Sequence, residues 1–456
     1  MRSAKIQLSN AALRWLETIL NERFGSELKL THGMEGLELR LKGHEGYILF
    51  DRSEAAFGRA DSNFPCYLWD AEAEGFQGRI AQLLPAPSSS DLCLPLVEFK
   101  ESKVCVHYDI LGLTFWMLCR GEEIGRTDLD EHQRFPSKHS HAFEHNYLER
   151  PIVDEWLDIL KQIIQRVWPG SALKVHQFEV KVSHDVDRPG RYAFKSLKGL
   201  IRSSAGDVLI RRDLLAALRA PWIWWYGRVK KRLHPWDPFN TFEWLMDRSE
   251  EHGLTSAFYF ICGRTDAARD ALYDPEMPAI RALMRRIHER GHEIGLHPSY
   301  GTYLDPKTLA AESNRLRRVC AEEGIEQKSW GGRMHYLRWD QYITLRAWND
   351  AGMSYDSSLT YADRPGFRCG TCFEYPAFDL VNDRALGVRE RPLIAMEGSV
   401  IAAHYLGLGP TEAAFEKFNL LKSRCKQVGG TFTLLWHNSF FDEDFYFDIY
   451  RRLLKH

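Results

Sequence analysis

Val180-Lys-Val-Ser-His-Asp-Val-Asp187 is an alternating apolar stretch that ends in two carboxylates, and Arg188-Pro-Gly190 follows it directly. The alternation predicts a β-strand, and Pro-Gly predicts that the strand stops there. Asp185 and Asp187 are therefore expected at the carboxyl end of a strand, where α/β proteins place reactive groups. Two close carboxylates repel each other, which suits a metal ligand beside a general base. An Asx-turn that caps the strand is the structural alternative.

The composition of the 456 residues is typical of a globular protein with two or three domains. The formal net charge of −2, from 60 basic and 62 acidic side chains, gives no electrostatic case for nucleic-acid binding. No apolar run is long enough to span a bilayer, and the N-terminus lacks the features of a signal peptide. Nine scattered cysteines indicate reduced thiols. We therefore expect a cytoplasmic protein, whose oligomeric state the sequence does not fix.

Residues 1–170 predict a smaller α+β domain of unknown role. A helical pattern covers Ala11 to Arg23, residues 110–118 suit a strand or a helix, and 148–168 predict an amphipathic helix that ends at Pro169-Gly170. Alternating apolar runs that predict strands lie at residues 37–41, 47–50, 96–99 and 104–108.

A polar loop at 131–146 carries four histidines: His132, His139, His141 and His145. Such a loop can bind a metal, but this spacing matches no known zinc finger. Contact with the cleft of the second domain is the other interpretation.

A segment near 192–238 is rich in Lys, Arg and Trp. It predicts a helical insertion whose aromatic side chains pack on the parent domain. A role at a membrane surface or in stacking on sugars is the alternative.

Strand and helix patterns alternate from residue 241 to residue 437. The predicted strands are 255–261, 292–297, 329–337 and 431–436, and the predicted helices are 241–252, 278–290, 308–323 and 341–350. Repeated strand–helix units imply a parallel sheet, and their number suits closure into a barrel. Residues 171–456 therefore predict a second, α/β domain.

Five motifs follow one another in this half: Ser183-His-Asp-Val-Asp187, Gly291-His-Glu-Ile-Gly-Leu-His297, Gly332-Arg-Met-His-Tyr-Leu337, Tyr355-Asp-Ser-Ser358 and Leu434-Leu-Trp-His437. Their order resembles that of the metal-dependent polysaccharide deacetylases, which are carbohydrate esterase family 4 with the nodulation-protein-B-like fold. The resemblance covers about residues 175 to 445. It implies a distorted (β/α) barrel on a divergent branch, because the smaller N-terminal domain is extra.

The resemblance also implies a chemistry, the hydrolysis of an N-acetyl group on an amino sugar or polysaccharide precursor. By carry-over, Asp187 and His297 would bind one divalent metal ion, for which zinc is favoured. Asp185 would be the general base, Arg333 would orient it, and His437 would be the general acid.

The second motif departs from the family pattern. Gly301 occupies the position of the family's second metal-binding histidine. Zinc requires a third protein ligand, and His335 is the best replacement, with His184 and His292 as fallbacks. A hydrogen-bonded histidine in the groove wall is an equally good interpretation of His335.

Candidate substrate-binding residues are Phe367, Arg368, Tyr336, Asp356 and Trp436, although alternation places Trp436 on the opposite face of its strand from His437. Phe367 and Arg368 belong to Gly366–Pro376, which predicts a Gly-rich loop lining the substrate groove, with Phe373 also touching the ligand. Cys369 and Cys372 in that loop could form a redox or metal pair, but no second Cys-x-x-Cys exists to complete a zinc site. Another amide or glycosidic hydrolase and a non-catalytic carbohydrate-binding or assembly protein remain the alternative functions.

Overall fold

The computed structural model describes residues 8–101, 103–441 and 443–455. The chain divides into two compact units. Unit 1 comprises Met1–Glu179, Leu359–Ile394 and Leu420–Phe432, and unit 2 comprises Val180–Ser358, Ala395–Asn419 and Thr433–His456. The segments Leu359–Ile394 and Leu420–Phe432, which are distant in sequence, therefore belong to the same compact unit as the N-terminal region. No helix in the described part of the chain has the length and apolar character needed to cross a membrane.

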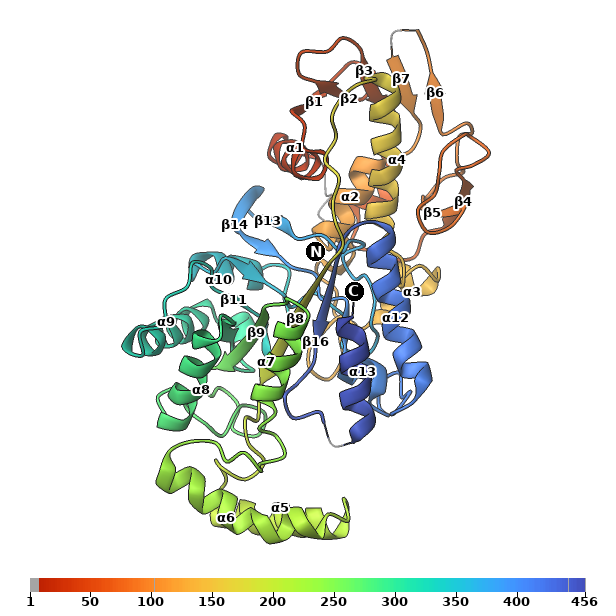
Figure 1. The fold of residues 1–456 in the computed structure, drawn as a ribbon. Coiled ribbons are helices and arrows are strands. Elements are labelled where there is room, and N and C mark those ends of the chain that lie inside the picture. Colours follow the sequence, from red (N-terminus) through yellow and green to blue (C-terminus); the bar gives the residue numbers. More distant parts are fainter. Residues whose placement is uncertain (1–7, 102, 442, 456) are drawn as a thin grey trace. The chain divides into compact units, whose positions relative to one another are not determined.

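Unit 1 mixes helices with short strands, most of which pair antiparallel, while β3 and β7 pair in parallel. Its sheet has the order β1-β2-β3-β7-β6, β4 pairs with β5, and β13 pairs with β14 (Figure 1). Its elements are α1 (Asn10–Phe24), β1 (Leu28–His32), β2 (Leu37–Leu41), β3 (Tyr47–Phe50), η1 (Ala55–Gly58), β4 (Cys66–Asp70), β5 (Leu83–Pro87), β6 (Val97–Phe99), β7 (Lys103–Val106), α2 (Ile110–Leu118), η2 (Gly121–Glu123), η3 (Ser137–His139), α3 (His141–Glu144), α4 (Ile152–Val167), β13 (Tyr375–Asp379) and β14 (Arg384–Glu390).

The apolar face of α4 supplies much of the core of unit 1. Trp156 stacks on Trp69 and on Tyr108, with ring centroids 5.2 and 4.2 Å apart. Its indole nitrogen donates a hydrogen bond to the carbonyl of Pro85. Stacked aromatic rings bury large apolar areas, so this contact ties α4 to the strand pair β4–β5.

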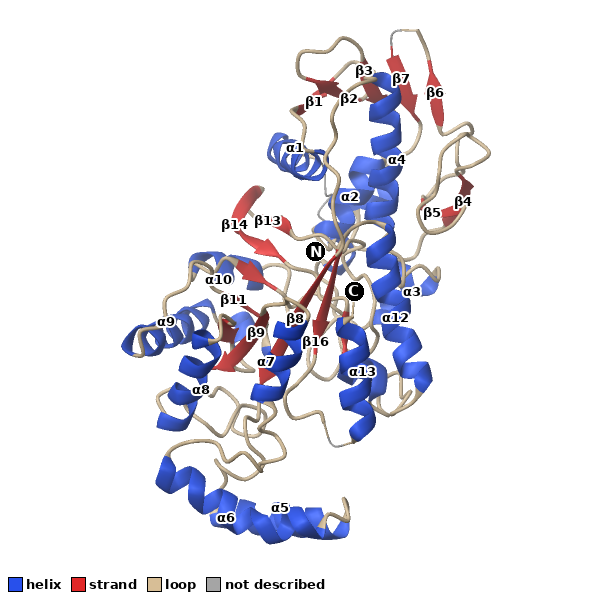
Figure 2. Cartoon of the chain, viewed as in Figure 1, coloured by secondary structure: helices blue, strands red, loops and turns tan. Residues whose placement is uncertain are grey.

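Unit 2 alternates strands and helices. Its elements are β8 (Glu179–Val186), α5 (Leu197–Leu209), α6 (Leu214–Lys230), α7 (Phe242–Glu251), β9 (Ser256–Ile261), α8 (Pro278–Glu289), β10 (Glu293–His297), η4 (Thr302–Leu304), α9 (Pro306–Glu322), β11 (Gly331–Gly332), η5 (His335–Leu337), α10 (Thr344–Asp350), β12 (Tyr355–Asp356), β15 (Ala395–Met396), α11 (Glu397–Ile401), α12 (Glu412–Gln427), β16 (Thr431–Leu435) and α13 (Asp444–Leu454). The first residue of β8, the first two of β16 and the last turns of α12 fall in unit 1. Figure 2 shows the strands of unit 2 in red with helices beside them.

The strands of unit 2 follow the order β12-β11-β10-β9-β8-β16-β15. The pairs from β12 to β8 and the pair β15–β16 are parallel. One row across the sheet aligns Val186, Phe260, Leu296, Gly332 and Asp356. The residues after this row, at the carboxyl ends of the strands, are therefore brought to one edge.

Helix boundaries in unit 2 follow local sequence signals. Helix α8 begins with Pro278 and buries Ile280, Leu283 and Ile287 on one face, and Gly291 follows it at φ 78°. Proline suits the first helical turn, and glycine adopts positive φ without strain. The predicted strand 329–337 is wrong beyond Gly332, because the backbone turns into η5 at His335–Leu337, where Tyr336 and Leu337 have positive φ.

The insertion at 192–238 is helical, as predicted, and consists of α5 and α6, drawn in yellow-green in Figure 1. Its base is held by Asp237, which accepts hydrogen bonds from the backbone N–H groups of Arg191 (2.7 Å) and Tyr192 (3.2 Å). The prediction that its aromatic side chains pack is wrong for Trp222, Trp225 and Trp236, which are exposed. Trp224 is half-buried and packs against the cluster of Tyr192, Leu200, Ala220 and Ile223.

Candidate metal and acid–base site

The site lies at the carboxyl ends of strands in unit 2. Asp187 follows the last residue of β8, His297 ends β10, and Arg333 follows β11. The register of the sheet places these three positions at one edge, because Val186, Leu296 and Gly332 precede them in one row. Strand β9 lies between β8 and β10, and its last residue, Ile261, pairs with His297. Gly332 permits this spacing, since a Cβ there would lie 1.8 Å from the Leu296 carbonyl oxygen.

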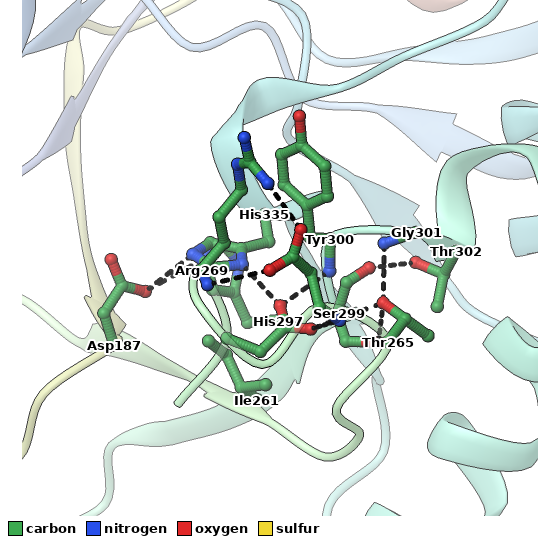
Figure 3. A network of polar contacts seen from close by, with 12 residues as sticks. Asp187, Ile261, Thr265, Arg269, His297, Ser299, Tyr300, Gly301, Thr302 and His335 are labelled. Carbon is green, nitrogen blue, oxygen red and sulfur yellow. Dashed lines mark hydrogen bonds and ion pairs between the residues drawn. The ribbon is translucent and has the colours of Figure 1, made fainter. Parts of the chain in front are cut away.

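Asp187, His297 and His335 bring one ligand atom each to within 4.8 Å of one another, close enough to hold a metal ion. Nε2 of His297 lies 3.3 Å from Asp187 Oδ1, and Nε2 of His335 lies 3.7 Å from the same oxygen. Figure 3 shows the carboxylate facing the two imidazoles.

The hydrogen bonds at Nδ1 of the two rings fix which nitrogen faces Asp187. Nδ1 of His297 donates to the Arg333 carbonyl at 2.6 Å, and Nδ1 of His335 donates to Asp270 Oδ1 at 3.0 Å. In the neutral rings Nε2 therefore carries a lone pair, so two lone pairs face a carboxylate. Asp187 Oδ1 is buried and accepts no hydrogen bond from the described residues. Three acceptors without a donor fit a divalent metal ion.

Charge coupling in the cluster is strong. Burial alone would raise the pKa of the Asp187 carboxyl, but the imidazoles of His335, His297 and His437 hold that pKa well below its ordinary value. Burial would lower the pKa of His297, and the carboxylates of Asp185 and Asp187 raise it instead. The cluster thus keeps Asp187 in its charged, ligating form, and a metal ion bound at His297 Nε2 would replace the proton that the raised pKa favours there.

Asp185 lies beside the cluster with a different partner. Nη1 of Arg333 donates to Asp185 Oδ1 at 2.7 Å, and both side chains are buried. Arg333 is itself fixed by the Ser357 carbonyl (2.8 Å) and Ser183 Oγ (2.9 Å). Asp185 Oδ2 lies 3.7 Å from His297 Nε2. The arrangement keeps one carboxylate oxygen oriented and leaves the other toward the cluster.

His437 lies on the Asp187 side of the cluster. Its Nε2 is 3.7 Å from Asp187 Oδ2, and its Nδ1 donates to Glu397 Oε1. Burial would lower the pKa of His437, but Glu397, followed by Asp187 and Asp185, raises that pKa to about 10. The imidazole therefore keeps its proton at neutral pH, which is the form a general acid requires.

Two residues of the site escape sequence reasoning. Glu397 follows the two-residue strand β15, and Asp270 lies in the loop after β9. Asp270 also accepts hydrogen bonds from the backbone N–H groups of Tyr300 and Asp266, each at 2.7 Å, so it fixes the loop that faces His335. Neither acid stands in a motif, although Glu397 directly follows the apolar run at 393–396.

Three predicted substrate-binding residues of unit 2 differ in placement. Tyr336 is half-buried, and its ring lies edge-on to that of His335, with centroids 4.8 Å apart. Asp356 is buried, accepts a hydrogen bond from Ser358 Oγ, and has its pKa raised to about 7 by burial. Trp436 is buried and donates to the Phe440 carbonyl at 3.0 Å. Of the three, only Tyr336 presents surface beside the cluster.

Phe367 and Arg368 belong to unit 1, not to the unit that carries the cluster. Both are buried, and Arg368 Nη2 donates to Glu123 Oε2 at 2.5 Å. Cys369 and Cys372 are buried free thiols. In this unit the loop serves as part of a core.

The two fallback histidines and two histidines of the 131–146 loop have protein partners. His184 Nδ1 contacts the Trp436 carbonyl at 2.7 Å, and His292 Nδ1 accepts from Ser256 N at 3.0 Å, so the fallback ligands are engaged elsewhere. His141 and His145 both contact the Phe64 carbonyl through Nε2, at 3.0 and 2.9 Å. Apart from Asp187, His297 and His335, the described residues contain no group of three or more His, Cys, Asp or Glu side chains that could hold a metal.

Comparison with known proteins gives two findings. A family model described as "Family of unknown function (DUF7033)" matches residues 10–169. A solved structure described as "Crystal structure of putative polysaccharide deacetylase from Mycobacterium smegmatis" is similar over 63% of this chain and 84% of that chain, at 17% sequence identity and a TM-score of 0.38. That likeness is too weak to assign a fold or an activity. No curated protein matches the chain.

Proposed function

We propose that this protein is a metal-dependent hydrolase that removes the N-acetyl group from an amino sugar or polysaccharide precursor. The observation that carries the proposal is the three-acceptor cluster of Asp187, His297 and His335 between two differently supported acid–base groups. Asp185 is paired with Arg333 on one side, and His437 is paired with Glu397 on the other. The order of the five sequence motifs supports the same chemistry.

Each group has one role in the proposed reaction. A bound divalent ion would supply Lewis-acid polarisation of the acetamide carbonyl. Asp185 would accept a proton from the attacking water, with Arg333 holding its carboxylate in place. His437 would donate its proton to the leaving amine. Amide hydrolysis needs a proton acceptor and a proton donor, and the site offers one of each.

Zinc is the proposed metal, because two imidazole nitrogens and one carboxylate oxygen leave a fourth tetrahedral position open. A distorted (β/α) barrel is the proposed architecture of unit 2. The parallel strand order from β12 to β8, with intervening helices, supports it. Tyr336 is the one predicted substrate-binding residue that we keep, since its ring borders His335.

The test combines metal analysis with acetate release by the purified full chain. We expect about one equivalent of divalent metal, lost in His297→Ala and in His335→Ala but retained in His288→Ala, a control on α8 outside the cluster. Metal-loaded parent protein should release acetate from N-acetylated amino sugars or their oligomers.

Two results would contradict the proposal. Full metal occupancy in His335→Ala would remove that residue from the site. Metal-replete protein that binds such sugars but never releases acetate would make the chain a binding protein.

A further inference from the structure

The α5–α6 hairpin presents an unusual amount of apolar surface. More than half of the large hydrophobic side chains that are exposed in the described part of the chain lie between residues 197 and 236. They are Leu197, Ile201, Val208, Leu209, Ile210, Leu214, Leu215, Leu218, Trp222, Trp225, Val229 and Trp236. Contiguous exposed apolar surface of this kind marks an interaction site.

Helix α6 concentrates this surface into a stripe. Five residues spaced by three or four positions share one helical face and are 44–78% exposed: Leu214, Leu218, Trp222, Trp225 and Val229. Ala216, Ala220 and Ile223 lie on the opposite face and are buried. Ala220 and Ile223 pack with Tyr192 and Leu200. The apolar stripe therefore faces away from the partner helix α5.

The hairpin is also strongly basic. Residues 192–238 contain ten Lys and Arg and three Asp, a formal charge of +7 in a chain whose net charge is −2. Two of the three acids are buried and engaged within the hairpin: Asp207 with Tyr192 and Arg211, and Asp237 at the base. At 100° per residue, Arg219 and Lys230 follow one edge of the stripe and Arg228 the other. An apolar stripe with basic edges is typical of helices that lie in the surface of an anionic bilayer.

We propose that the α5–α6 hairpin binds the surface of an anionic lipid bilayer, with the α6 stripe in the interface and the basic side chains among the headgroups. Tryptophan rings and long basic side chains both suit this depth. Two copies of a hairpin with a charge of +7 repel each other, which disfavours self-association through this face. Sugar stacking would use the tryptophans but would leave Leu214, Leu218 and Val229 in water. This proposal is independent of the proposed hydrolysis.

Sedimentation of the full chain with vesicles tests the proposal. We expect binding to phosphatidylcholine vesicles that contain about one quarter phosphatidylglycerol, and at least about tenfold weaker binding to pure phosphatidylcholine or in about 1 M salt. The double variant Leu214→Ser/Leu218→Ser should weaken binding about tenfold or more. Leu68→Ser/Leu272→Ser, which changes two exposed leucines outside the hairpin, should bind like the parent.

A second pair of variants separates the charge from the apolar stripe. Arg219→Glu/Lys230→Glu should lose binding to anionic vesicles while keeping the thermal unfolding midpoint of the parent. Lys307→Glu/Lys328→Glu reverses two charges outside the hairpin and should leave vesicle binding nearly unchanged.

Three outcomes would overturn the proposal: no binding of the parent to anionic vesicles, equal binding of Leu214→Ser/Leu218→Ser, or equal binding to neutral vesicles. Binding of the parent to an insoluble polysaccharide without vesicle binding would assign the stripe to carbohydrate. A dimer that Leu214→Ser/Leu218→Ser abolishes, again without vesicle binding, would assign the stripe to a second copy.

Discussion

Arg333 in unit 2 and Arg368 in unit 1 make nearly the same bond. Each is buried, and each donates to a carboxylate: Arg333 to Asp185 at 2.7 Å, Arg368 to Glu123 at 2.5 Å. The sequence predicts a functional role for both: Arg333 would orient the general base Asp185, and Arg368 would bind substrate. Their surroundings differ. Asp185 Oδ2 faces His297 and the cluster of acceptors, whereas both oxygens of Glu123 are bonded, Oε1 to Arg368 Nε (3.0 Å) and Arg120 Nε (2.8 Å).

The difference shows that a buried ion pair does not by itself mark a functional site. The Arg368–Glu123 pair in unit 1 belongs to a network of protein groups that bond to one another. Arg120, which donates to Glu123, also donates to Glu122 and to the Tyr361 hydroxyl. Burial would raise the pKa of Glu123, but Arg368 and Arg120 lower it, so the network supports its own charges. The pair in unit 2 borders an acceptor atom that no described donor satisfies. Such an unsatisfied acceptor is the stronger sign of a ligand.

The largest expected effect is on turnover. Asp185→Asn should lower the rate of acetate release about 10²–10⁴-fold, because it removes the general base, while the bound metal stays at the parental level. Asp187→Asn should lose both metal and activity. Metal content and the rate of acetate release, measured on the same preparations, test these two roles. If Asp185→Asn loses the metal and Asp187→Asn keeps it, Asp185 is the metal ligand and Asp187 is the general base.

The Arg368–Glu123 pair predicts an effect on stability instead. Glu123→Gln leaves Arg368 and Arg120 buried with one negative charge fewer, which should cost about 3–5 kcal/mol in the free energy of unfolding. Acetate release per folded molecule should stay within about twofold of the parent. Denaturant unfolding measures the loss, and Glu27→Gln, at an exposed pair with Lys42, is the control with a change near zero. If Glu123→Gln lowered the rate of acetate release without lowering the free energy of unfolding, the Arg368–Glu123 pair would have a functional role, and the distinction from Arg333 would be wrong.

A smaller effect, on metal affinity, is expected from Asp270, which is hydrogen-bonded to His335. Asp270→Asn weakens the hydrogen bond that orients His335, and such changes lower metal affinity about 10–100-fold. Competition with a chromophoric chelator measures this affinity. Asp266→Asn, in the same loop but without a contact to His335, should bind metal like the parent. Equal affinity of both variants would mean that His335 needs no support from Asp270.

A buried acid without any arginine completes the comparison. Asp109 caps α2 by accepting from Gly112 N at 2.7 Å, and no basic side chain pairs with it among the described residues. Burial raises the pKa of Asp109 from 3.8 to about 6. The folded state therefore holds this proton more tightly than the unfolded state, and its contribution to stability is full below pH 3.8 and lost as the pH rises through about 6.

Asp109→Asn removes this dependence. The variant should gain roughly 2–3 kcal/mol over the parent between about pH 4 and pH 7, on top of any constant offset, and gain nothing further above that range. Denaturant unfolding of both proteins across this range gives the difference. A flat difference would show that Asp109 titrates normally.

Sequence periodicity predicts most of the regular elements. The helices α1, α4, α8 and α9 and the strands β2, β3, β8, β9, β10 and β16 lie where apolar spacing places them, within a few residues. Residues 110–118, whose sequence suits a strand or a helix, form the helix α2. The same apolar spacing puts Asp185, Asp187, His297 and His437 at strand ends, and parallel pairing is enough to bring such positions together. These positions needed only local information. Arg333 instead falls inside the predicted strand 329–337.

What the sequence does not predict depends on partners that are distant along the chain. Glu123 and Arg368 are 245 residues apart, so nothing near Gly366–Pro376 shows that its arginine is already paired. Glu397 and Asp270 stand in no periodic segment, and only the fold brings them to His437 and His335. The same limit applies to the insertion, since Lys, Arg and Trp content does not tell which face of α6 is covered.

The base of the α5–α6 hairpin has a kinetic consequence. The chain leaves β8 just after Asp187 to enter the insertion, and Asn438, the residue after His437, donates to the carbonyls of Arg188 (3.1 Å) and Phe239 (2.7 Å) at its two ends. A hairpin seated on lipid would therefore keep the reactive groups near that plane. If the sugar substrate is anchored in the same membrane, enzyme and substrate would meet by lateral diffusion. The rate of acetate release would then depend on the number of substrate molecules per unit of membrane area. Adding lipid without substrate, at a constant total concentration of enzyme and substrate, would dilute the substrate in the membrane and slow this reaction. Hydrolysis of a freely dissolved sugar would not be slowed by such surface dilution.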